Sequence, residues 1–310
     1  MKYLIIGAGG TGGAIGAYLT RGGLDCTLIA RGDNLSALVR DGLTLIHENG
    51  ESEIIKVNAV NESAYSDQPD VVFVCVKGYS LDSIYPLLRK VCNRDTIVIP
   101  ILNLYGIGAQ IAADSGVNCL VTDGCVYMAS QRIRPGVFQL NGDILRIVYG
   151  VRDPGEGNMT LFRIREELKS VGIDAVLSDN IRRDALQKFS YVSPMAAAEL
   201  YHQANAGEFK KTGDARDFFI CLVREIDSLA NAMEIPFLVD VARNNLAILD
   251  SINDNATTSL YRDIEAGLES EVDGLIFEVL RMGKEYQVSL PCYTKVADEI
   301  SARYGLKTHF

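Results

Sequence analysis

The chain opens with an apolar strand that runs directly into closely spaced glycines. Residues 2–6 read Lys-Tyr-Leu-Ile-Ile, and Gly7, Gly9 and Gly12 follow with the spacing G-x-G-x-x-G. In such a strand–turn–helix, the first glycine permits a tight turn, the second lets backbone approach a pyrophosphate, and the third lets the helix pack closely on the sheet. The pattern predicts a dinucleotide site, and the alternative is a glycine-rich turn without a ligand. Its cofactor-binding residues would be Gly7, Gly9, Gly10, Thr11 and Gly12.

The end of the second predicted strand, residues 26–30, distinguishes the two nicotinamide dinucleotides. An acidic residue about 20 positions beyond the glycines would bind the ribose 2′-hydroxyl of NAD. This chain has Ala30-Arg31-Gly32 there. A guanidinium pairs with phosphate oxygens that a carboxylate would repel, so Arg31 favours NADP. The alternative is that Arg31 is only solvated surface.

Length and charge narrow the class of protein. At 310 residues the chain exceeds the size at which one core usually stops growing, so we expect two domains. The net charge of -10 opposes binding to nucleic acid or to an anionic membrane. No apolar run reaches the roughly 18 residues of a membrane span, and a strand stands where a leader would be. We therefore expect a cytoplasmic protein.

Cysteines and histidines do not form a recognisable site. The seven cysteines are odd in number and lack a C-x-x-C pair, so we expect reduced core residues. His47, His202 and His309 lie far apart without metal-ligand spacing. Neither a metal site nor a His-centred triad is predicted.

Strand-like and helix-like segments alternate in the first half of the chain, which predicts a parallel sheet with crossover helices. We expect strands at residues 3–6, 26–30, 71–76, 96–99 and 118–121, and helices at 10–22, 34–41, 81–91 and 107–114. Asn49-Gly50 predicts a hairpin, and Asn141-Gly142 predicts a turn between strands 137–140 and 144–149.

From residue 160 onward the pattern is mainly helical, apart from a short strand at 175–177. Apolar stripes at 218–233 and 272–280 have helical spacing and are typical of core. The predicted fold class is α/β: an N-terminal Rossmann-type doubly wound parallel sheet over residues 1–177 and a C-terminal all-helical domain over 178–310.

Several polar residues are candidates for a site. Lys77 and Asn103 directly follow predicted strands, where ligands of doubly wound sheets bind. The alternative is that they are ordinary polar turn residues at strand ends. Lys188 lies among apolar and small residues, where partial desolvation would lower its pKa and make it a usable proton donor. Glu271, near Ser270 and Asp273, precedes an apolar helix, and helix capping is the simpler explanation for it.

Together these positions resemble the ketopantoate reductases (2-dehydropantoate 2-reductases) over nearly the whole chain. The glycine turn, Arg31, Lys77 and Asn103 with Gly106 recur in the family's order, as do Lys188 after the segment 181–186, Ser259 and Glu271-Val-Asp-Gly274.

The resemblance implies NADPH-dependent reduction of a small 2-keto acid to the 2-hydroxy acid, on the route to pantothenate and coenzyme A. By this analogy Lys188 is the general acid and Glu271 is its charge partner or a contact to the substrate hydroxyl. Asn103 positions the lysine and the nicotinamide, and Ser259 holds the substrate carboxylate. An ammonium at the carbonyl oxygen would stabilise the charge that hydride transfer builds and deliver the proton.

The departures from the family lie in the second half. Val192 and Ala196 stand where the family usually has Asn, and Ser80 where Gln is common. Ser190 or Ser193 could substitute as donors, and we place Ser193 among the substrate-binding residues. Three hypotheses remain: ketopantoate reductase, an NADPH-dependent reductase of another 2-keto acid, and a non-catalytic NADP-binding sensor. The oligomeric state stays open, with a homodimer as the alternative to a monomer.

Overall fold

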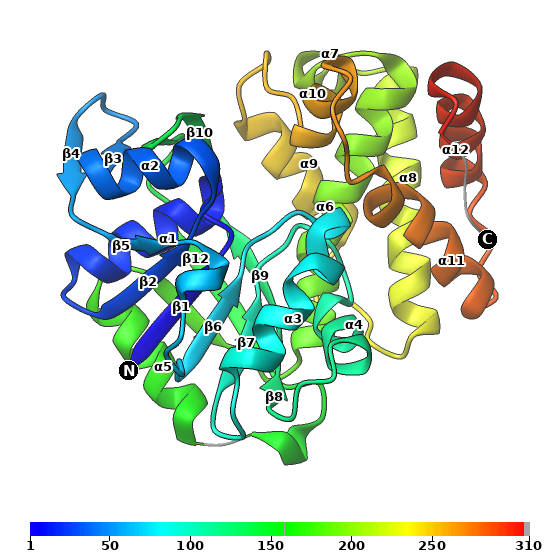
Figure 1. The fold of residues 1–310 in the computed structure, drawn as a ribbon. Coiled ribbons are helices and arrows are strands. Elements are labelled where there is room, and N and C mark those ends of the chain that lie inside the picture. Colours follow the sequence, from blue (N-terminus) through cyan, green and yellow to red (C-terminus); the bar gives the residue numbers. More distant parts are fainter. Residues whose placement is uncertain (158, 307–310) are drawn as a thin grey trace. The chain divides into compact units, whose positions relative to one another are not determined.

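The computed structural model describes residues 1–157 and 159–306, and the chain divides into two compact units (Figure 1). The first unit contains Met1–Leu102 and Gly106–Ile181, and the second contains Asn103–Tyr105 and Arg182–Phe310. His309 lies outside the described residues. In the described part of the chain, no helix is both long and apolar enough to cross a membrane.

The first unit is built on a six-stranded parallel sheet of order β5-β2-β1-β6-β7-β8. This order confirms the doubly wound sheet, because it is the Rossmann order with the reversal between β1 and β6. The strands are β1 (Lys2–Ile6), β2 (Asp25–Ile29), β5 (Asn58–Val60), β6 (Val71–Val74), β7 (Ile97–Pro100) and β8 (Leu120–Val121).

Helices cover this sheet, as a parallel sheet with apolar strands requires (Figure 1). Every residue of β6 and β7 is buried, which explains their unbroken apolar sequences. The helices are α1 (Gly10–Arg21), α2 (Gly32–Asp41), α3 (Leu81–Val91), α4 (Ile107–Asp114) and α5 (Met159–Ser170), with 3₁₀ turns η1 (Glu62–Ala64), η2 (Gly78–Ser80) and η3 (Pro154–Glu156).

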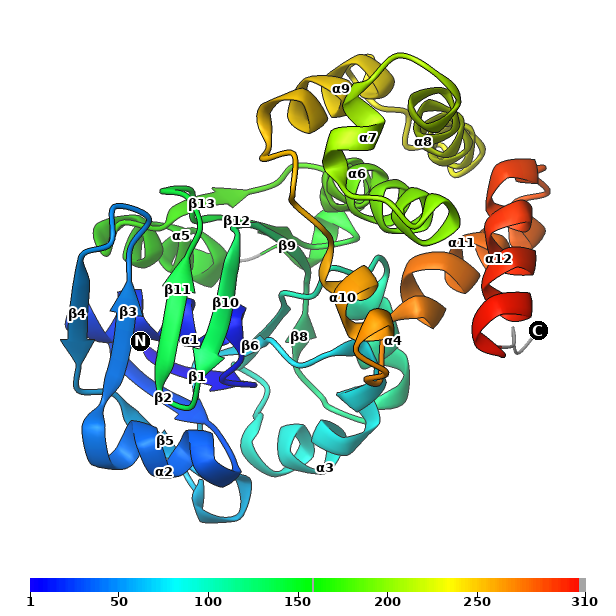
Figure 2. The same cartoon turned by 90° about the horizontal axis from the view of Figure 1, so that it is seen from above.

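Two smaller sheets complete the first unit (Figure 2). One has the order β10-β11-β3-β4 and the other the order β13-β12-β9. Their strands are β3 (Leu43–Ile46), β4 (Ser52–Ile55), β9 (Asp123–Tyr127), β10 (Ser130–Arg134), β11 (Val137–Leu140), β12 (Arg146–Gly150) and β13 (Asp174–Leu177).

The predicted hairpin at Asn49-Gly50 is confirmed, and Asn141-Gly142 lies between the two strands that it was expected to connect. The antiparallel pair β3 and β4 flanks Asn49-Gly50, where Gly50 has a φ of 84°. Asn141-Gly142 connects β11 to β12 as expected, although these two strands belong to different sheets and do not pair with each other. β11 forms its hairpin with β10, around Gly136 at a φ of 74°. Both glycine dipeptides are turn-like locally, and only the partner strand distinguishes a hairpin from a crossover.

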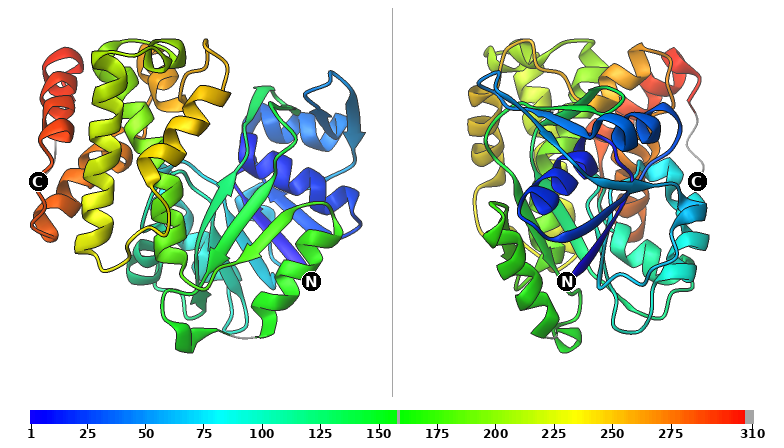
Figure 3. Two further views of the ribbon diagram at one scale, coloured as in Figure 1. Left: turned by 180° about the vertical axis from the view of Figure 1, so that it is seen from behind. Right: turned by 60° about the vertical axis from the view of Figure 1, so that its left-hand side comes forward.

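The second unit is helical (Figure 3). Its core includes Leu222, Ile226 and Leu229 of α8, all fully buried, in agreement with the predicted stripe. The helix α6 continues through Pro194. The helices are α6 (Ile181–His202), α7 (Ala206–Lys210), α8 (Asp214–Ala232), α9 (Val241–Ser251), α10 (Ser259–Glu265), the π-helix η4 (Asp273–Phe277), α11 (Glu278–Glu285) and α12 (Pro291–Tyr304).

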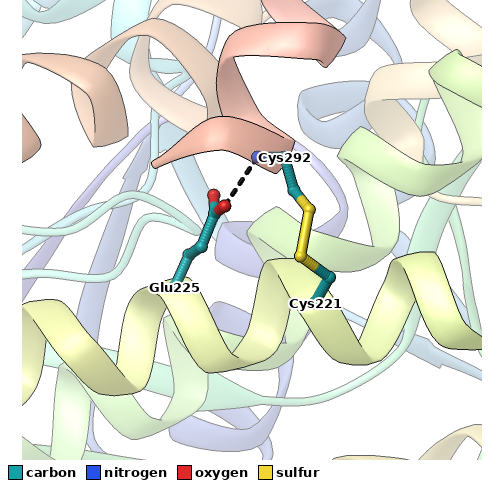
Figure 4. A group of neighbouring side chains, drawn as sticks. All are labelled: Cys221, Glu225 and Cys292. Atoms are coloured by element: carbon teal, nitrogen blue, oxygen red, sulfur yellow. Dashed lines mark hydrogen bonds between the residues drawn. A yellow bond between two sulfur atoms is a disulfide. The ribbon is translucent and has the colours of Figure 1, made fainter. Parts of the chain in front are cut away.

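A disulfide joins α8 to α12 in this unit. Cys221 and Cys292 are 71 residues apart in sequence and are bonded to each other (Figure 4). Glu225, one turn further along α8, accepts hydrogen bonds from the backbone N–H groups of Cys292 at 2.6 Å and Tyr293 at 3.0 Å. The expectation that every cysteine is reduced is therefore wrong for this pair, because a long-range pairing leaves no spacing signal. The other five cysteines are not disulfide-bonded.

Candidate active site

In the turn between β1 and α1, two glycines leave no room for a side chain, whereas a third does. A Cβ on Gly12 would lie 2.1 Å from the Gly7 carbonyl oxygen, and Gly7 has a φ of 105° against the backbone of Cys75. A Cβ on Gly9 would meet nothing within 4 Å. The fold itself therefore requires glycine at Gly7 and Gly12. At Gly9 the backbone is accessible to a ligand beside the first turn of α1.

A cavity of about 760 Å³ lies beside this turn, at the carboxyl ends of the parallel strands. Of the predicted cofactor residues, Gly7, Gly9, Arg31 and Lys77 line it. Gly10, Thr11, Gly12 and Asn103 are not among its lining residues. The cavity begins where the strand order reverses between β1 and β6, the place where doubly wound sheets bind ligands.

The cavity also has polar residues that sequence reasoning missed. Arg132 of β10 adds a second arginine to Arg31, and Asn61 and Ser63 contribute from the segment after β5. No local signal could have identified Arg132, because the pairing of β10 was not predicted. Glu62 is the acidic residue among those lining the cavity. Open backbone at Gly9, the helix N-terminus and two guanidinium groups fit the phosphates of a dinucleotide.

In the second unit, Lys188 donates a hydrogen bond from its Nζ to the Oδ1 of Asn103. Asn103–Tyr105 is the short segment that belongs to the helical unit despite its place between β7 and α4. Packing holds this segment: a Cβ on Gly274 would lie 2.9 Å from the Leu104 side chain, and the Tyr105 and Phe189 rings are 6.1 Å apart. The small residue in Glu271-Val-Asp-Gly274 therefore makes room for the chain that presents Asn103.

The other predicted catalytic and substrate residues lie at helix ends. Glu271 is only 7% exposed and precedes η4, while Ser259 is the half-buried first residue of α10. Asp273 forms a two-point ion pair with Arg281, at 3.0 and 2.7 Å, instead of capping a helix. A π-helix such as η4 is rare in proteins, and those that occur are often found at functional sites.

Ser193 lies inside the helical core. It is fully buried, its hydroxyl donates to the Leu275 carbonyl at 2.6 Å, and it lies 2.5 Å from the Tyr293 hydroxyl. Ser190 is also fully buried, and its hydroxyl accepts from Asn245 Nδ2 at 3.1 Å. Both hydroxyls are used inside the helical core, so we remove Ser193 from the substrate-binding set.

One buried acid was missed by sequence reasoning. Glu199 of α6 is fully buried, and its Oε2 accepts hydrogen bonds from Thr258 N at 2.8 Å and Thr258 Oγ1 at 2.5 Å. Burial raises its pKa to about 7, although these hydrogen bonds oppose the rise. The detectable signal was a lone acid inside the apolar run 195–200.

Two family models match most of the chain. "Ketopantoate reductase PanE/ApbA" matches residues 3–154, and "Ketopantoate reductase PanE/ApbA C terminal" matches residues 180–303. The chain belongs to the ketopantoate reductase family. This is a family of nicotinamide-dependent oxidoreductases that act on CH–OH and C=O groups.

Individual relatives are distant but extend over nearly the whole chain. A 2-dehydropantoate 2-reductase from Mesorhizobium japonicum is 26% identical, with 92% of each chain covered. Among solved structures, a D-mandelate dehydrogenase with NADH and anilino(oxo)acetate has a TM-score of 0.86 at 23% identity, covering 97% of this chain and 98% of the other. A dimeric ketopantoate reductase from Staphylococcus aureus has a TM-score of 0.83 at 20% identity, covering 98% and 99%. These structural likenesses concern the fold.

Proposed function

We propose that the protein reduces a 2-keto acid to the 2-hydroxy acid with NADPH, and that 2-dehydropantoate is its substrate. The observation that carries this proposal is the hydrogen bond between Lys188 and Asn103. It joins a cation able to give a proton to an amide that fixes its direction, as the family's chemistry requires. A non-catalytic sensor would need the glycine turn and Arg31 but not this pair.

The bound dinucleotide would supply the hydride, and residues of the chain would do the rest. Gly7, Gly9, Arg31 and Lys77 would hold it, with Arg31 pairing with the 2′-phosphate that distinguishes NADPH. The Lys188 ammonium would stabilise the negative charge that develops on the carbonyl oxygen and donate a proton there. Asn103 would keep the Lys188 Nζ directed at that oxygen.

Two further residues would hold the lysine and the substrate in their working states. Glu271 would keep Lys188 protonated as its charge partner or contact the substrate hydroxyl, since a nearby carboxylate favours an ammonium that burial disfavours. Ser259 would hold the substrate carboxylate. The product would enter the route to pantothenate in the cytoplasm, and a homodimer is the assembly to test first.

A specific observation favours a second substrate class. Val192 and Ala196 lie one and two turns beyond Lys188 on α6, where the family usually has amides, and Ala196 is fully buried. A site without these amides would discriminate less well for the hydroxyl of 2-dehydropantoate and would accept a more apolar 2-keto acid.

The test is NADPH oxidation at saturating 2-dehydropantoate and with a panel of other 2-keto acids, for wild type and Lys188→Ala. We expect Lys188→Ala to lower kcat by about 10²- to 10⁴-fold with unchanged NADPH affinity, because general acid catalysis supplies gains of that order. Turnover of another keto acid alone would assign the second substrate class. NADPH binding without turnover of any substrate would favour the sensor.

A further inference from the structure

Glu199 satisfies only one of its two carboxyl oxygens. Its Oε2 accepts both hydrogen bonds from Thr258, whereas its Oε1 is buried and has no hydrogen-bond partner among the described residues. Glu225, the comparable buried acid of α8, uses both oxygens on backbone N–H groups. A buried acid that leaves an oxygen unpaired is costly, so its retention calls for a specific role.

The two hydrogen bonds of Glu199 act on the residue that starts α10. Thr258 is the N-cap of α10, and its Oγ1 accepts from Tyr261 N at 3.2 Å. Because Thr258 donates its hydroxyl proton to Glu199, the oxygen is free to accept from Tyr261. Glu199 thereby fixes both the backbone N–H and the hydroxyl of the residue immediately before Ser259.

We propose that Glu199 is a positioning residue for the substrate carboxylate: acting through Thr258, it orients Ser259, and its protonated form permits the anion to bind there. This inference rests on the proposed function, in which Ser259 holds that carboxylate. A charged Glu199, hydrogen-bonded to the residue next to Ser259, would repel a carboxylate held by Ser259, so substrate binding favours the neutral acid. A pKa of about 7 for Glu199 places its charge change where both forms are populated near neutral pH.

Among the other ionisable groups near Glu199, His202 lies one turn further along α6, and burial lowers its pKa, so its imidazole is already neutral near pH 7. Arg262 on α10 favours the charged form of Glu199. The pKa values of Tyr191 on α6 and Tyr261 on α10 are raised above the ordinary value, so both phenols stay neutral near pH 7. Arg303 of α12 donates a hydrogen bond to the carbonyl of Leu200, the residue after Glu199.

The test is steady-state kinetics from pH 5.5 to 9 with NADPH and the 2-keto acid that the wild type reduces, comparing wild type, Glu199→Gln and Glu225→Gln. In the wild type we expect the substrate KM to rise about tenfold above pH 7 as Glu199 ionises, relative to Glu199→Gln. Glu199→Gln keeps an acceptor for Thr258 without the charge, so its KM should stay low and flat. Glu225→Gln, a matched buried acid outside the α10 contact, should follow the wild type.

Two additional variants separate positioning from a merely structural role. Glu199→Ala should raise KM several-fold at every pH with little change in kcat, because Thr258 loses its acceptor. Thr258→Val removes one hydrogen bond that favours the carboxylate, so the KM transition should move to higher pH. The Thr258 variant also serves if Glu199→Gln does not fold.

The outcomes distinguish this inference from the function on which it rests. A wild type that reduces no 2-keto acid at any pH overturns both. An active wild type whose KM is flat across pH 7, or a Glu199→Gln profile that tracks the wild type, overturns the role of Glu199 and leaves the proposed function intact.

Discussion

The cavity of the first unit and the polar cluster of the second are built from different parts of the chain. The backbone at Gly7 and Gly9 and the ends of the strands contribute to the cavity of the first unit. Side chains on packed helices form the second, where Lys188 meets Asn103 across 85 residues of sequence. Backbone geometry restricts which residue a position accepts, whereas a helix face tolerates many. The first site can therefore be predicted from the spacing of residues in the sequence, whereas the second depends on how the helices pack.

The largest expected effect separates two roles within the glycine turn. Gly12→Ala should lower the free energy of unfolding by about 4 kcal/mol or more, since its Cβ would lie 2.1 Å from the Gly7 carbonyl oxygen. Gly9→Ala should change stability by less than about 0.5 kcal/mol, because its Cβ meets no protein atom within 4 Å. Chemical denaturation measures both.

NADPH titration then completes the comparison. Gly9→Ala should bind NADPH at least about tenfold more weakly, because the second glycine lets the backbone approach the pyrophosphate. A Gly9→Ala protein that binds normally, or a fully stable Gly12→Ala protein, would show that this turn is not the phosphate site that we describe.

The prediction from sequence followed the same division. The doubly wound parallel sheet and the helix α4 over residues 107–114 could be predicted, because most of the buried parallel strands carry unbroken apolar runs between helical patterns. The hairpin of β10 and β11 could not be predicted, because a turn dipeptide does not indicate which strands pair with each other. In the helical unit, Ser193 and Glu199 were misjudged or missed because spacing does not reveal which face of α6 is buried.

The helical unit has no continuous sheet among its described residues, and reducing the disulfide tests how much of its stability comes from this cross-link. Losing a bond between residues 71 apart should lower the free energy of unfolding by about 4 kcal/mol, from the greater entropy of the unfolded chain. We expect a reductant to lower the unfolding midpoint of the wild type. The Cys221→Ser/Cys292→Ser double variant is the matched control and should not respond to it. A wild-type midpoint that ignores the reductant would mean that this pair is not bonded in solution.

The smallest expected effect concerns which arginine selects the cofactor. Arg31→Ala should raise the KM for NADPH by about 10- to 100-fold, the value of one or two charge-assisted hydrogen bonds, and leave NADH unchanged. Arg21→Ala is the control, because Arg21 is paired with Glu53 at 2.7 Å and does not line the cavity. The decisive comparison is Arg132→Ala, which removes the other lining arginine. If Arg132→Ala alone abolishes the preference for NADPH, cofactor selection depends on the pairing of β10, a feature that spacing along the chain does not encode.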